Sequence, residues 1–113
     1  MTDQLATSGE SGASHAALAA ILTLSAQMLR TAREEDWFGL ADQEARRRQL
    51  LAAVLGAPDV FDAVALRAMI RKVLDFDRDI MALVEAGRRT LGGQLELLQH
   101  GQRATTAYQN AVG

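Results

Sequence analysis

Cysteine is absent from this 113-residue chain, which contains one proline and few aromatic residues. The absence of cysteine excludes a disulfide framework, a thiolate metal site and a thiol nucleophile. No apolar stretch approaches the roughly 20 residues that span a bilayer, and the amino terminus lacks a signal-peptide pattern, so we expect no membrane partner. Twelve basic and fourteen acidic residues give a net charge of -2. This balance is unfavourable for phosphate attraction, so we expect no nucleic-acid partner. The absence of cysteine and of a signal-peptide pattern predicts a cytoplasmic location.

Few side chains suit catalysis or metal binding. His15 and His100 are the only histidines, and no acidic residue has metal-ligand spacing with either. The pattern Asp75-x-Asp77-x-Asp79 resembles the opening of a calcium loop, but Ile80 stands where that loop requires glycine. We therefore expect no catalytic residue, no metal site and no cofactor.

What the chain does contain is helical periodicity. Residues 1–13 are rich in small polar residues and predict a disordered N-terminal tail, and residues 14–113 predict a single helical bundle domain. Within it we expect one helix over residues 14–33, a second over 37–55, and a third from residue 62 to about residue 110. No alternating run typical of a strand is present, so the fold class is all-α.

The expected helix ends have recognisable signals. Ser14 is suited to cap the first helix and Asp36 the second. Gly56 and the nearby proline end the second helix, and Asp59 or Asp62 caps the third. We expect Trp37 to pack in the hydrophobic core. We expect the run from Arg46 to Arg48 to be mostly solvated.

An apolar stripe at heptad spacing runs along the third helix and is longer than the first two helices can cover. Its members are Leu66, Ile70, Val73, Asp77, Ile80, Val84, Leu91, Leu95, Leu98, Thr105 and Tyr108. Asp77 interrupts the stripe, and we expect it to hydrogen-bond across the bundle and fix the register. Gly92-Gly93 predicts a kink or break, so the fold is an antiparallel three- to four-helix bundle with a long third helix. Fold-back, self-association or client binding would each cover the distal stripe.

Several segments resemble the flagellar export chaperone FliT family. The first is Leu22-x-x-Ser25-x-x-Met28-Leu29, followed by Asp36-Trp37 and the Arg-rich run that leads to Leu50-Leu51. The segment from Ile70 to Leu83 and the close Gly101-x-x-Ala104-x-x-x-Tyr108 extend the resemblance over residues 18–108.

The resemblance implies a cytoplasmic chaperone that binds the C-terminal region of the filament-cap protein before type III export and keeps it from premature assembly. It also implies contacts with flagellar export machinery components and, in some lineages, with a flagellar transcription regulator. The implied bundle has a C-terminal helix able to cover the client surface. The residues expected to bind a partner are Ile80, Val84, Leu91, Leu95, Leu98 and Tyr108. The alternative is a homodimeric coiled-coil structural or adaptor protein without a dedicated client.

Overall fold

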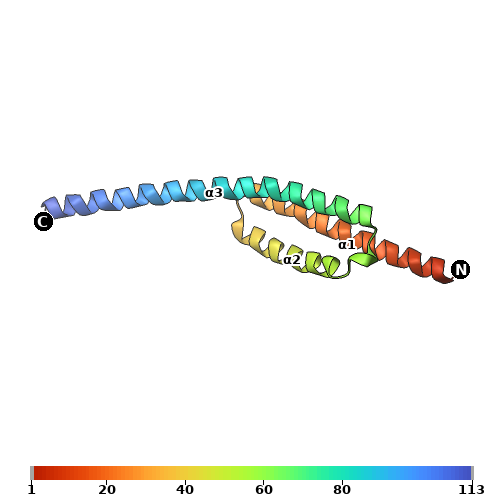
Figure 1. Ribbon diagram of the computed structural model, residues 1–113. Helices are drawn as coiled ribbons and strands as arrows, with labels where there is room; N and C mark the ends of the chain where they lie inside the picture. Colours follow the sequence, from red (N-terminus) through yellow and green to blue (C-terminus); the bar gives the residue numbers. More distant parts are fainter. Residues whose placement is uncertain (1, 113) are drawn as a thin grey trace. The chain divides into compact units, whose positions relative to one another are not determined.

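The computed structural model contains three α-helices, labelled in Figure 1: α1 (Thr2–Arg33), α2 (Trp37–Leu55) and α3 (Ala63–Val112), with a 3-10 turn, η1 (Pro58–Val60). It describes the backbone of residues 2–112 and the side chains of residues 12–95 and of Leu98. The chain divides into two compact units, residues 1–81 and residues 82–113. The first unit holds α1, α2 and the first part of α3, and the second holds the rest of α3. The all-α bundle predicted from the periodicity is confirmed.

The corner between α1 and α2 is closed by a Schellman motif. The amide of Asp36 donates to the Thr31 carbonyl at 3.2 Å, and the amide of Glu35 donates to the Ala32 carbonyl at 3.1 Å. Glu35 has a φ of 60°, a left-handed conformation that the motif requires and glycine usually supplies. The Asp36 side chain then accepts from the amide of Gly39 at 2.9 Å. Asp36 therefore ends one helix and caps the next, as predicted for the cap.

Glu35→Gly is expected to raise the free energy of unfolding by about 1 kcal/mol, because a left-handed φ is unfavourable for residues with a Cβ. The neighbouring variant Glu34→Gly is the control: it removes the same charge where φ is not positive. Urea denaturation of both variants checks the expectation. Equal destabilisation by the two substitutions would contradict it.

The connection from α2 to α3 follows the sequence signals. The amide of Gly56 donates to the Ala52 carbonyl at 2.9 Å, and α2 ends at Leu55 as predicted. Of the two candidate caps of α3, Asp62 fills the role, since its Oδ2 accepts from the amide of Ala65 at 3.0 Å. Ser14 does not cap a helix: it is buried within α1, and its hydroxyl donates to the Val60 carbonyl at 3.4 Å. This contact ties α1 to η1.

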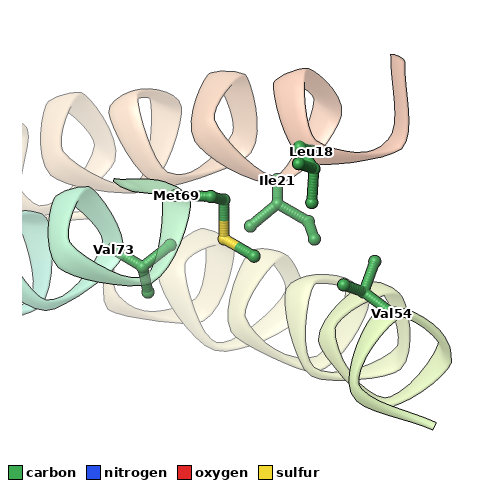
Figure 2. Packing of buried hydrophobic residues seen from close by; sticks show 5 residues of the cluster. All are labelled: Leu18, Ile21, Val54, Met69 and Val73. Carbon is green, nitrogen blue, oxygen red and sulfur yellow. The ribbon is translucent and has the colours of Figure 1, made fainter. Parts of the chain in front are cut away.

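The hydrophobic core of residues 1–81 lies between the three helices. A central cluster joins Leu18 and Ile21 of α1, Val54 of α2, and Met69 and Val73 of α3, as Figure 2 shows. The spacing of three residues between Leu18 and Ile21 and of four between Met69 and Val73 places each pair on one face of its helix, and burial of these side chains stabilises the bundle. Trp37, expected in the core, is half-buried, and the adjacent Phe38 is exposed.

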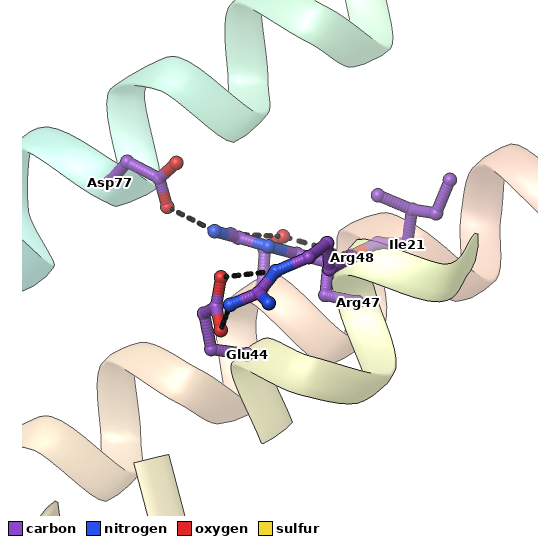
Figure 3. Close-up of polar contacts among 6 residues, drawn as sticks. Ile21, Glu44, Arg47, Arg48 and Asp77 are labelled. Atoms are coloured by element: carbon purple, nitrogen blue, oxygen red, sulfur yellow. Dashed lines mark hydrogen bonds and ion pairs between the residues drawn. The ribbon is translucent and has the colours of Figure 1, made fainter. Parts of the chain in front are cut away.

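A buried polar network crosses this core. Arg47 of α2 lies 2.7 Å from the carboxylate of Asp77 on α3, and its guanidinium also donates to the Ser25 hydroxyl of α1 at 3.1 Å. Ser25 in turn donates to the Ile21 carbonyl at 2.9 Å. Figure 3 shows the Arg47 side chain directed to Asp77, while the neighbouring Arg48 pairs with Glu44. The predicted hydrogen bond of Asp77 across the bundle is present, and one arginine of the run expected to be solvated is buried because Asp77 and Ser25 offer it partners.

Two boundaries differ from the sequence expectations. Helix α1 begins at Thr2 rather than near Ser14. The side chains of residues 1–11 lie outside the described residues, and the disordered tail over residues 1–13 and the single domain over residues 14–113 stay predictions. Helix α3 continues through Gly92 and Gly93, so the predicted break is not found there. Each glycine costs about 1 kcal/mol relative to alanine in a helix, and the good helix formers on both sides outweigh this cost.

By length and composition alone, the described segment Gly12–Arg33 is long and apolar enough to cross a membrane, with a mean hydropathy of 1.3. The sequence analysis predicts no such segment, because no uninterrupted apolar stretch of roughly 20 residues is present. Of the most apolar 18-residue stretch in this segment, 39 % is buried. Its buried face supplies Leu18, Ile21 and Met28 to the core, and core helices of soluble proteins meet the same criterion.

Candidate partner-binding surface

Three leucines of α3 form an exposed face within residues 82–113. Leu91, Leu95 and Leu98 have 51 %, 58 % and 63 % of their surface accessible. Their spacing of four and then three residues places them on one side of the helix. We call these three residues the leucine face. Burying the remainder of such side chains in a complex is favourable by about 25 cal/mol per Å² of apolar surface.

The backbone beside the leucine face is open. Gly92 and Gly93 lie between Leu91 and Leu95 in the sequence. A Cβ added to either glycine would have no neighbour within 4 Å. Three charged residues shortly precede the face on α3: Glu85, Arg88 and Arg89. Glu85 and Arg88 form a weak exposed pair at 4.0 Å. The arrangement offers an apolar ridge able to pack against another helix, with charges at one end.

The other residues predicted to bind a partner have different surroundings. Ile80 is buried in the part of α3 that belongs to residues 1–81. Val84 is half-buried, and the side chain of Tyr108 lies outside the described residues. The structure thus brings three of the six predicted residues onto an exposed face. Heptad spacing alone does not predict which residues of the stripe are buried, as Ile80 is, and which are exposed, as the three leucines are.

Two of the three carboxylates in the acidic pattern of α3 form ion pairs. Asp77 pairs with Arg47, and Asp75 lies 3.8 Å from Arg78 one turn later. Among the residues whose side chains are described, no group of three or more His, Asp or Glu residues is placed to hold a metal ion. His15 is exposed, and the His100 side chain lies outside the described residues.

The sequence analysis did not identify a further pair of exposed apolar residues on α3. Leu74 and Met81 lie on the solvent side of α3, away from the core positions Met69, Val73 and Ile80. Their interval of seven residues is the sequence pattern that could have identified this pair. The longer apolar stripe on the core side of α3 is the more prominent pattern.

These features define the protein as a small all-α bundle with an exposed apolar helix face, which is an architecture suited to binding other proteins. The sequence model of the family described as Flagellar protein FliT matches residues 15–110. The chain belongs to this family, and the resemblance drawn from its motifs is confirmed. Membership indicates a flagellar chaperone, and the family is not known for enzymatic activity.

No match was found among curated proteins or among solved structures.

Proposed function

We propose that this protein is a cytoplasmic export chaperone that binds the C-terminal region of the filament-cap protein and keeps it from assembling before type III export. Membership of the FliT family supports the chaperone role. The observation that carries the binding site is the leucine face, because three large apolar side chains on one side of a helix are exposed together. Transient contacts with export machinery components and a transcription regulator belong to the same proposal.

The mechanism follows from the packing of amphipathic helices. A client segment with apolar residues at spacings of three and four lays them against Leu91, Leu95 and Leu98. Burial of both apolar faces drives the association, and the client surface needed for assembly is then occupied. Binding requires no nucleotide in this scheme, since the energy comes from the contact itself.

Autoinhibition by the C-terminal segment is a further part of the proposal. For residues 94–113 to cover a client surface on α3, the helix has to open, and the pair Gly92-Gly93 is the least costly place for this. A client then competes with the segment, and its apparent affinity falls in proportion to the time the surface is covered.

Calorimetric titration against the C-terminal region of the filament-cap protein from the same genome tests the proposal, using the full chain and a form lacking residues 94–113. We expect saturable binding by the full chain. Tighter binding by the shortened form assigns residues 94–113 a competing role. Weaker binding assigns them to the client surface through Leu95 and Leu98. Absence of binding by the full chain would contradict the cap-protein proposal.

A homodimeric coiled coil is the second candidate, favoured by the heptad interval between Leu91 and Leu98. Self-pairing would bury the same leucine face against a second copy. Sedimentation equilibrium over a wide concentration range distinguishes the two candidates. A dimer that becomes monomeric when the leucines of this face are substituted supports self-pairing. A monomeric parent protein leaves the face available to a client.

A further inference from the structure

The solvent side of α3 within residues 1–81 carries a mixed basic and apolar face. Its members follow one another at intervals of four, three, four and three residues: Arg67, Arg71, Leu74, Arg78 and Met81. These intervals keep all five on one side of a helix, and all five are exposed. We call them the arginine face. Leu74 and Met81 have 59 % and 61 % of their surface accessible.

The bundle does not require apolar side chains at these two positions. The residues that this helix contributes to the core are Met69, Val73 and Ile80, which are all buried. Leu74 and Met81 are exposed and add nothing to the core. A bundle helix ordinarily carries polar residues on its solvent side. A single exposed leucine is common, but two large apolar residues seven apart, with an arginine between them, form a short seam of the kind that packs against a second helix.

Two of the three arginines on this face have no ion-pair partner among the described side chains. Among the described side chains, no carboxylate lies within ion-pair distance of Arg67 or Arg71, and Arg78 has only a long exposed contact with Asp75. The exposed arginines of α2 differ, because each pairs with an acidic residue four positions earlier, Asp42 or Glu44. The arginine face therefore concentrates positive charge in a chain whose formal net charge is -2.

We propose that the arginine face binds an acidic amphipathic α-helix of another protein. The apolar residues of that helix pack against Leu74 and Met81, and its flanking carboxylates pair with Arg67, Arg71 and Arg78. Partial burial strengthens such ion pairs and fixes the register of the two helices. The surface is separate from the leucine face, so this inference does not rest on the identity of the export client.

Two other occupants fit less well. A second copy of the chain would meet this face through a two-fold axis, which places arginines opposite arginines. Nucleic acid would use the arginines but leave Leu74 and Met81 in water, and the net charge opposes it. An acidic helix satisfies both the charges and the apolar seam.

The test uses a synthetic helical peptide with leucines at intervals of three and four flanked by glutamates, and a matched peptide with lysine in place of glutamate. Fluorescence anisotropy with the full chain is expected to give an affinity for the glutamate peptide at least about tenfold higher, decreasing with salt. Equal affinity for the two peptides would overturn the proposal. So would tighter binding of a short DNA duplex than of the glutamate peptide.

Variants locate the site. Arg71→Glu with Arg78→Glu is expected to weaken binding of the glutamate peptide about tenfold or more, and Leu74→Ser with Met81→Ser should weaken it similarly. The matched control, Arg46→Glu with Arg48→Glu, reverses two exposed charges on α2 and should change affinity less than twofold.

Since all of these residues are exposed, circular dichroism is expected to show an unchanged fold. The substitutions Leu91→Asp and Leu98→Asp on the leucine face should leave binding of this peptide intact. If they abolish binding, or if the control arginines of α2 matter as much as those of α3, the assignment to the arginine face is wrong. A concentration-dependent mass that is lost on reversal of Arg71 and Arg78 would instead assign the face to self-association.

Discussion

Asp77→Ala is expected to lower the free energy of unfolding by about 3 kcal/mol, because it leaves the buried guanidinium of Arg47 without its carboxylate partner. The Arg47 side chain is 9 % exposed, so water cannot replace the lost contact fully. We take the lower end of the range for broken buried pairs because Asp77 itself is 36 % exposed. Urea denaturation followed by circular dichroism measures the change.

A matched control on the same helix is Asp79→Ala. Asp79 is exposed and forms no ion pair among the described residues, and the substitution makes the same change in helix propensity and charge. We expect Asp79→Ala to be within about 0.5 kcal/mol of the parent protein. If the Asp77 and Asp79 variants unfold at the same denaturant concentration, the network does not stabilise the bundle.

Replacing both partners, as in Arg47→Met with Asp77→Leu, is expected to recover most of the stability lost in Asp77→Ala. Apolar groups of similar volume avoid the desolvation cost that a lone buried charge incurs. Ser25 keeps a hydrogen bond in this variant through the Ile21 carbonyl. Recovery would show that the penalty in the single variant comes from the unpaired charge rather than from lost packing.

Leu91→Asp combined with Leu98→Asp is expected to weaken binding of the cap-protein C-terminal region about 100-fold or more, equivalent to about 3 kcal/mol. The substitutions remove apolar area from the leucine face and introduce charges that a complex would have to desolvate. Because both side chains are exposed, the stability of residues 1–81 should not change. Calorimetric titration gives the affinity, and circular dichroism verifies the helix content.

The control for this variant is Ala86→Asp with Thr90→Asp. It adds the same two negative charges to exposed positions of α3 away from the leucine face. Client affinity is expected to stay within about threefold of the parent protein, since surface substitutions outside an interface have small effects. Equal loss of binding in the two double variants would attribute the effect to charge rather than to the leucine face. Unchanged binding in both would place the client surface elsewhere.

The local elements of this fold were predictable from short-range signals. Asp36 caps α2, Leu55 is its last residue, and Asp62 caps α3, because a capping side chain or a helix-ending residue acts within a few positions. Local reasoning failed at Ser14. Ser14 had the residue type of a cap, but it lies inside α1 and donates to the carbonyl of Val60, a contact between residues far apart in the chain.

The candidate site was predictable only in part. The heptad spacing identified Leu91, Leu95 and Leu98 together with Ile80, but periodicity treats every position of a stripe alike. Burial of Ile80 depends on which segments of the other helices lie beside it. The exposed pair Leu74 and Met81 was missed for the same reason, since the longer stripe on the other side of α3 dominates the pattern.

The sequence by itself determined that the chain is all-α, where α2 and α3 begin, and which family it belongs to, because caps, periodicity and motif order are properties of neighbouring residues. The tertiary structure decided which apolar residues are buried and which are exposed. It also decided that Arg47, rather than Arg46 or Arg48, enters the core. That choice depends on Ser25 and Asp77 meeting one side of α2, and such pairings between distant helices are set by packing that no local pattern encodes.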